Sequence, residues 1–194
     1  KIQYEFIQRN PQISIVGSDV FEFNNHSKNI FLKTMKNDLN FIKYSLRNPL
    51  NHPTVLFRKK DIIKSGSYEN IKFFEDYELW LRCLKKGLNI HNINLPLVAM
   101  KRTSYFSKRH GSKYALYELN FIKEALKQKT ISRFLIPIYL LRICLRLVPV
   151  RLLDLSRIID PLRNEYKNSY NLAIYIRKIN INENSILQKF NFLN

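Results

Sequence analysis

Apolar residues along the chain follow the spacing of strands in some segments and the spacing of helices in others. Four segments rich in β-branched and aromatic residues predict strands: 13–23 (ISIVGSDVFEF), 30–34 (IFLKT), 54–58 (TVLFR) and 95–102 (LPLVAMKR). Five segments with helical spacing predict helices: 1–10, 35–48, 59–66, 75–87 and 112–130. Strands and helices are therefore interleaved over the first two thirds of the chain.

The helix predicted at 75–87 is the best defined of these elements. From Tyr77 onward its apolar residues recur at 77, 80, 81, 84 and 88, and Arg82 is predicted on the opposite face, as a surface or helix-packing residue. Gly87 stands where a left-handed C-cap belongs. The first turn carries a dense group of carboxylates, Glu75, Asp76 and Glu78.

Two explanations account for adjacent carboxylates at the start of a helix. The helix dipole and the free N–H groups of the first turn stabilise acidic side chains there by several tenths of a kcal/mol. Alternatively, one carboxylate serves as a general base, which must lie at the edge of a cleft to reach a substrate hydroxyl. Helical periodicity alone does not separate the two.

Composition describes a folded and strongly basic chain. Of its 194 residues, 45% are hydrophobic and 13% aromatic, which excludes disorder over most of the length. The 33 Lys and Arg against 15 Asp and Glu give a net charge of +18, and a basic surface of this size favours a polyanionic partner: nucleic acid, anionic lipid or a phosphorylated substrate. Cys83 and Cys144 show no pairing pattern and the four histidines no zinc-binding spacing, so two reduced cysteines are expected.

Residues 132–159 form a segment rich in Leu, Ile and Arg. Its longest apolar run, 134–141, is far shorter than the roughly 20 residues of a membrane span. Arg142 and Arg146 lie one helical turn apart. Such a basic amphipathic element is suited to the headgroup region of an anionic membrane, but a helical hairpin packed on the domain with solvated arginines is an equal alternative.

Several segments together resemble the second half of a family 2, GT-A fold bacterial glycosyltransferase. They are YEFIQRNPQISIVGSDVFEF (4–23), NPLNHPTVLFRK (48–59), SGSYE (65–69), FEDYELWLRCLKKG (74–87) and LPLVAMKR (95–102). The resemblance covers residues 1–158 approximately. It implies an α/β fold, a partial GT-A mixed sheet with helices, followed by a basic helical C-terminal tail. The predicted domains are an acceptor-side half at 1–105, a helical basic amphipathic tail at 106–159 and an unassigned Asn/Lys/Ile-rich extension at 160–194.

The resemblance implies an inverting transfer of a sugar from a nucleotide-diphospho-sugar to an acceptor hydroxyl. By the motif match, Asp76 is the base that takes the hydroxyl proton, and Glu75 holds the acceptor or orients the aspartate. The family uses Mg²⁺ or Mn²⁺ to neutralise the leaving diphosphate. The aspartates that bind this metal are expected before residue 1, because GSD at 17–19 supplies a single aspartate. The chain is therefore interpreted as a fragment, with no metal ligands of its own.

Four further residues are predicted to bind substrate through the same resemblance. His52 and Asn51 belong to the NPLNHP loop near donor and acceptor, where His52 could equally bond the backbone. Arg58 could face phosphate, although a solvated strand end is favoured slightly. Trp80 matches the family's helix aromatic, with packing in the core favoured over stacking on a sugar. The basic cluster Lys108, Arg109 and Lys113 could meet a lipid diphosphate; a solvated face is the commoner explanation.

The predicted function is sugar transfer in bacterial capsule, O-antigen or exopolysaccharide synthesis. The partners would be a nucleotide-diphospho-sugar donor, a lipid-linked or saccharide acceptor, and an anionic membrane surface contacted through 132–159. This places the protein in the cytoplasm, peripheral to the inner face of the cytoplasmic membrane. Two alternatives remain: a catalytically inactive remnant that binds a membrane or partner, and a nucleic-acid-binding protein, against which no recognised nucleic-acid motif is present.

Overall fold

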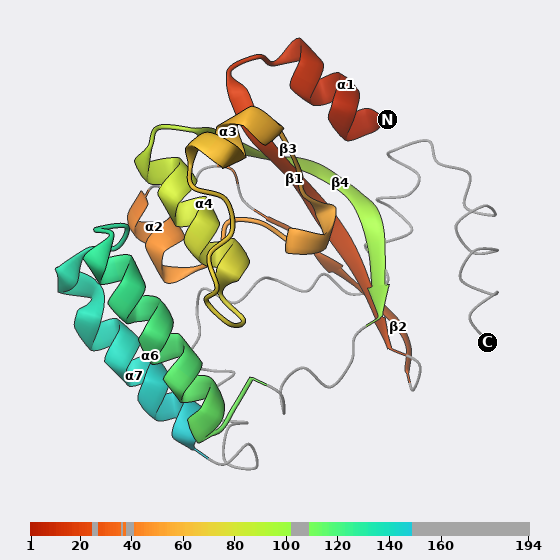
Figure 1. Ribbon diagram of the computed structural model, residues 1–194. Coiled ribbons are helices and arrows are strands. Elements are labelled where there is room, and N and C mark those ends of the chain that lie inside the picture. The colour runs from red at the N-terminus through yellow and green to blue at the C-terminus, as the bar shows by residue number, and fades with distance from the viewer. Residues whose placement is uncertain (25–26, 36, 38–40, 102–108, 149–194) are drawn as a thin grey trace.

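A mixed sheet organises the structure, a computed structural model that describes residues 1–24, 27–35, 37, 41–101 and 109–148. Its central strand is β1 (Ile13–Asn24), which pairs in parallel with β4 (Asn89–Lys101) along most of its length. On its other edge β1 pairs antiparallel with β3 (Leu56–Phe57) near its start and with β2 (Ser27–Lys33) near its end. The described residues thus form an open α/β sheet of four strands with both parallel and antiparallel neighbours (Figure 1).

Helices lie on both faces of this sheet (Figure 1). They are α1 (Ile2–Arg9), α2 (Phe41–Leu46), α3 (Lys59–Lys64), α4 (Glu75–Lys85), α6 (Ser112–Lys127) and α7 (Ile136–Leu147), with short 3₁₀ turns η1 (His52–Thr54) and η2 (Arg133–Leu135). Successive side chains of a strand point to opposite faces. Accordingly Ile15 packs with Leu79 and Trp80 of α4, whereas Val16 packs with Ile7 of α1.

The predicted strands and helices are largely confirmed, with shifts at their ends. The strand at 54–58 is shorter than predicted, because residues 52–54 form the turn η1 and only Leu56 and Phe57 pair with β1. The last strand begins six residues earlier than its apolar run, because its first residues pair in parallel with the start of β1. The predicted C-cap is confirmed: Gly87 has φ +77°, and the N–H of Leu88 donates to the carbonyl of Cys83 at 3.0 Å.

The hairpin of α6 and α7 shares a core with the rest of the domain. The ring of Phe121 on α6 stacks on Phe74 and Tyr77 at centroid distances of 4.9 and 5.0 Å. Tyr77 and Tyr139, from α4 and α7, both donate hydrogen bonds to the carbonyl of Ser45. The boundary predicted at 105/106 falls outside the described residues, as does the predicted extension 160–194.

The predicted packing of the hairpin on the domain is confirmed, but Arg142 and Arg146 pair with its interior and are not simply solvated. Their guanidinium groups lie 2.6 and 3.1 Å from the carboxylate of Glu118, which is completely buried on α6. Arg142 also donates to the carbonyl of Leu46, and Arg146 to that of Arg109. The two arginine side chains, 27% and 25% exposed, therefore join α7 to α6 and α2, and contact of this segment with a membrane stays a prediction. Within the described ranges, no helix is long and apolar enough to cross a bilayer.

Candidate functional site

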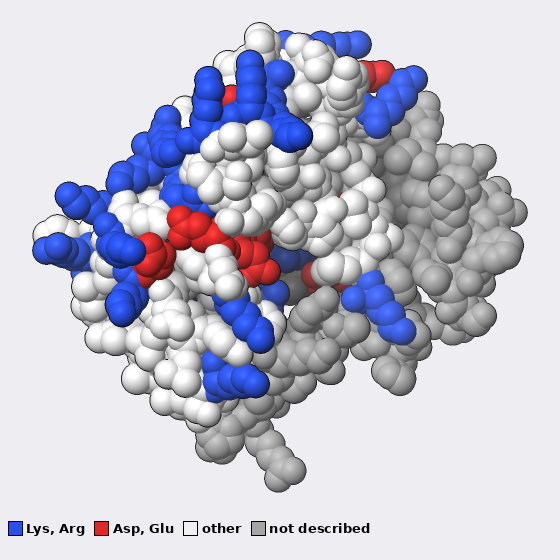
Figure 2. Space-filling view, in the orientation of Figure 1, with Lys and Arg blue, Asp and Glu red and all other residues white. Residues whose placement is uncertain are grey.

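The three carboxylates at the start of α4 have three different environments. Glu75 is exposed, Asp76 is partly buried, and Glu78 is completely buried, with Arg82 Nε donating to its Oε1 at 2.6 Å. Burial raises the pKa of Glu78, and the bond from Arg82 opposes that shift. Figure 2 shows a group of acidic side chains across the middle of this face, with Lys and Arg spread around it. Glu78 is a structural residue, which leaves Asp76 and Glu75 at the surface of the site.

Asn48 holds the carboxylate of Asp76. Its Nδ2 donates to Asp76 Oδ2 at 2.8 Å, while its Oδ1 accepts from the backbone N–H of Leu50 at 3.1 Å. The second contact fixes which end of the amide faces Asp76, since a backbone N–H requires an acceptor. Asn48 directly precedes Pro49 in the predicted loop, and sequence reasoning did not single it out. The pair Asn48-Pro49 predicts a rigid turn, but it does not predict a contact between Asn48 and Asp76.

An aromatic group lies beside the aspartate. The ring centroids of His52, Tyr68 and Trp80 are 6.1 to 6.4 Å apart in each pairing. Burial raises the pKa of Tyr68, and the negative charges of Asp76 and Glu75 raise it further. His52 and Tyr68 are exposed, whereas Trp80 is completely buried. The structure therefore places His52 beside Tyr68, a residue that sequence reasoning quoted within SGSYE without assigning it a role.

The turn that carries Tyr68 is held by α4 itself. Arg82 donates to the carbonyl of Ser65, and to that of Ser67 at 2.6 Å. Gly66 between them has φ +97°, and a Cβ at that position would lie 2.7 Å from the Arg82 guanidinium. Arg82 is thus the helix-packing residue of the two options predicted for it. Since α4 supplies Asp76 as well, one helix positions both Asp76 and Tyr68.

Lys33 at the end of β2 lies within electrostatic range of Asp76. Burial lowers the pKa of its ammonium group, and Arg109 and Arg47 lower it further, while Glu22 and, to a smaller extent, Asp76 raise it. Val20 of β1 is its partner in the sheet. A lone lysine in a strand carries no sequence signal of function, because its neighbour Asp76 lies far along the chain.

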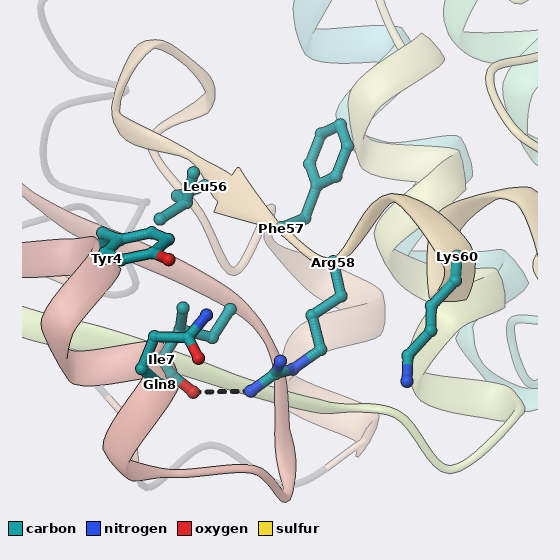
Figure 3. Close-up of a pocket in the computed structure, with 7 residues that line it drawn as sticks. All are labelled: Tyr4, Ile7, Gln8, Leu56, Phe57, Arg58 and Lys60. Atoms are coloured by element: carbon teal, nitrogen blue, oxygen red, sulfur yellow. Dashed lines mark hydrogen bonds between the residues drawn. The ribbon is translucent and has the colours of Figure 1, made fainter.

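The other predicted binding residues point elsewhere. Asn51 is buried, and its Nδ2 donates to the carbonyl of Ser18, which ties the loop to β1. Trp80 packs in the core between α4 and the sheet, as favoured. Arg58 donates to the carbonyls of Ile13 at 2.9 Å and Ile7 at 2.5 Å. Figure 3 shows the Arg58 side chain reaching across a pocket toward α1. It is therefore a structural link between α1 and the sheet, not the solvated strand end that was favoured.

Asp19 of the GSD segment lies inside β1 and is 1% exposed. Its Oδ1 accepts a hydrogen bond from the backbone N–H of Met35 at 3.0 Å. In the described part of the chain, His, Cys, Asp and Glu side chains nowhere gather in threes in a way that could hold a metal ion. The described residues therefore do not fit the Mg²⁺ or Mn²⁺ expected from the resemblance.

We expect Asp19→Asn to stabilise the fold at neutral pH. Burial raises the pKa of Asp19 to about 6, and the Met35 bond opposes this. Between pH 4 and 6, approximately, the folded chain keeps a proton that the unfolded chain has lost, so stability falls as pH rises through that window, by on the order of 3 kcal/mol. Urea unfolding should show the variant more stable than the parent at pH 7.5 and equal to it at pH 4. An equal difference at both pH values would contradict the assignment; Asp61→Asn is the control.

No family model matches the chain. Comparison with curated proteins finds a relative described as amylovoran biosynthesis glycosyltransferase AmsE of Erwinia amylovora, 34% identical over 159 residues, which are 78% of this chain and 58% of the relative. A second is the UDP-Gal:alpha-D-GlcNAc-diphosphoundecaprenol beta-1,3-galactosyltransferase of Escherichia coli, 38% identical over 75% of this chain and 54% of that protein. A third relative, the O-antigen biosynthesis glycosyltransferase WbnJ of Escherichia coli, is 32% identical over 71% of this chain and 55% of that protein.

The chain spans about half the length of the curated relatives it matches. All three carry names of glycosyltransferases, and two are named for the synthesis of a bacterial polysaccharide. The matches cover about three quarters of this chain. This chain is similar in sequence to bacterial proteins named as glycosyltransferases.

Proposed function

We propose that the chain is the acceptor-side half of an inverting GT-A glycosyltransferase of family 2. The whole enzyme would transfer a sugar from a nucleotide-diphospho-sugar to a hydroxyl of a lipid-linked acceptor in bacterial surface-polysaccharide synthesis. The observation that carries the proposal is the fixed carboxylate of Asp76. Asn48 holds one of its oxygens, and no donor among the described residues occupies the other, Oδ1.

Asp76 is the general base of this reaction. Its Oδ1 takes the proton of the acceptor hydroxyl as that oxygen attacks the anomeric carbon of the donor, and the nucleoside diphosphate leaves from the opposite side. A hydrogen bond to the second oxygen keeps the base in one orientation, so less conformational entropy is lost when the reactive geometry is reached. Glu75, exposed beside it, binds acceptor hydroxyls; His52 and Tyr68 form the sugar-facing rim. Because the described residues do not fit a divalent cation, no step is assigned to one.

The similarity to one relative supports the proposed acceptor class. One relative is named for action on a GlcNAc-diphosphoundecaprenol acceptor. A lipid diphosphate of this class would place the enzyme at the inner face of the cytoplasmic membrane, where nucleotide sugars are present.

The test is a transfer assay with the full-length protein from its native host. It is incubated with a short-chain GlcNAc-diphospho-lipid and, one at a time, a panel of nucleotide-diphospho-sugars, and products are read by mass spectrometry. Addition of one sugar with inverted anomeric configuration supports the proposal. Absence of product with every donor would favour the inactive remnant, and binding of mixed-sequence DNA that survives about 200 mM salt would favour a nucleic-acid-binding protein.

Asn48 is expected to act on turnover through Asp76. In the full-length protein, Asn48→Ala should lower kcat about tenfold or more while changing KM little, because the carboxylate loses its orientation and not its charge. Asn89→Ala, which removes an amide bonded to the carbonyl of Gln12 on the surface, is the matched control. Initial rates over a range of acceptor concentrations measure the split. A loss confined to KM, or an equal loss in the control, would contradict this role.

A further inference from the structure

Helix α7 is apolar on its exposed side as well as on its buried side, where Tyr139 and Ile143 lie in the core. Its two charged residues, Arg142 and Arg146, turn inward to the buried Glu118. Its exposed side consists of Pro137, Ile138, Leu140, Leu141, Cys144 and Leu147. Phe134, in the turn η2 just before the helix, is 93% exposed. A helix that faces water normally presents polar residues on that side.

An apolar surface of this continuity marks an interaction site in a soluble domain. In the rest of the hairpin, the exposed charges point to the nature of the partner. Four basic residues of the hairpin are exposed: Lys113, Lys123, Lys129 and Arg133. The described hairpin has two acidic residues. Glu118 is buried, and the carboxylate of Glu124 accepts hydrogen bonds from Gln128 and Lys127. An apolar side with a cationic surround is complementary to the acyl chains and phosphates of an anionic bilayer. A second copy of the chain would bring the same positive charges together.

We propose that the outward side of α7, together with Phe134, docks on an anionic lipid surface. The hairpin forms the layer of the structure farthest from the sheet (Figure 1), so it can contact a bilayer without the sheet approaching it. The side chains that enter the lipid are the apolar ones, and Lys129 and Arg133 at the Phe134 end meet the headgroups. The arginines at 142 and 146 hold the helix in this orientation. The docking side itself is inferred from the exposed residues of α7. The choice of a lipid surface over other anionic surfaces rests on the proposed function.

The test is co-sedimentation of the full chain with two kinds of vesicle. One kind is neutral phosphatidylcholine, and the other contains about 30 mol% of the anionic lipid phosphatidylglycerol, which gives its surface a negative charge. We expect binding to the anionic vesicles and about tenfold weaker binding, or none, to the neutral ones. The double variant Leu140→Gln/Leu141→Gln should lose at least about tenfold in partition, because two side chains no longer enter the acyl region. Both positions are exposed, so circular dichroism of the variant should match the parent.

Leu116→Gln is the matched control, since this leucine is 60% exposed on the neighbouring helix α6. Its binding should stay unchanged. Equal binding of the double variant and the parent would overturn the proposal. So would an association of the free chain into dimers that the double variant abolishes, since that would identify a second copy as the occupant.

Cys144 offers an independent measurement on the same side of α7. It is exposed, whereas Cys83 is completely buried. An environment-sensitive fluorophore attached to Cys144 should shift to shorter wavelength when anionic vesicles are added. Failure of the free native chain to react at Cys144 would show that another part of the chain already covers this side, and would overturn the proposal. The vesicles contain neither donor nor acceptor, so a negative result here leaves sugar transfer untouched.

Discussion

Asp76→Asn is expected to lower kcat for sugar transfer in the full-length protein by about a thousandfold, with little change in donor or acceptor binding. The amide cannot accept the hydroxyl proton, and general-base catalysis accounts for about 10²–10⁴ in rate. The fold should survive, because an asparagine oxygen can still accept the bond that Asn48 Nδ2 now donates at 2.8 Å. Single-turnover rates with saturating donor, together with circular dichroism, measure the two effects separately.

The control for this experiment is Asp61→Asn. Asp61 is also an aspartate in the first turn of a helix, α3, so both variants lose a similar dipole interaction of several tenths of a kcal/mol. If acidic residues at the start of α4 served only the helix dipole, the two variants would have the same small loss of stability and normal turnover. Near-normal turnover of Asp76→Asn would therefore mean that the carboxylate only stabilises the start of the helix and is not the general base.

Helix α4 shows how far the sequence could be interpreted correctly. Its bounds, its cap at Gly87 and the inward side of Tyr77, Trp80 and Leu81 followed from local spacing, because each depends on residues within one or two turns. The burial of Glu78 and Arg82 did not follow. These two polar residues are buried because they pair with each other at 2.6 Å and because Arg82 binds carbonyls of the turn before the helix.

The orientation of α7 shows where sequence reasoning failed. The spacing of Arg142 and Arg146 placed both on one side of the helix. It did not predict that this charged side packs inward and that an apolar side faces outward. That choice was decided by Glu118 on another helix, 28 residues before Arg146. Asn48 and Lys33 were missed for a similar reason, since their relation to Asp76 exists only after folding brings distant segments together.

Glu118→Gln should destabilise the hairpin strongly. The carboxylate is completely buried between two guanidinium groups, at 2.6 and 3.1 Å, and both arginines remain partly buried when it is gone. Removing one member of a buried ionic group leaves uncompensated charge and costs about 3–5 kcal/mol. Urea unfolding followed by circular dichroism at pH 7 measures the difference.

Glu124→Gln is the comparison for this prediction, because it lies on the same helix and pairs with the exposed Lys127 at 3.4 Å. An exposed pair of this kind contributes about 0.2–1 kcal/mol, so the control should remain close to the parent. Equal stability of the two glutamate variants would mean that packing of Tyr139 and Ile143 alone sets the orientation of the helix.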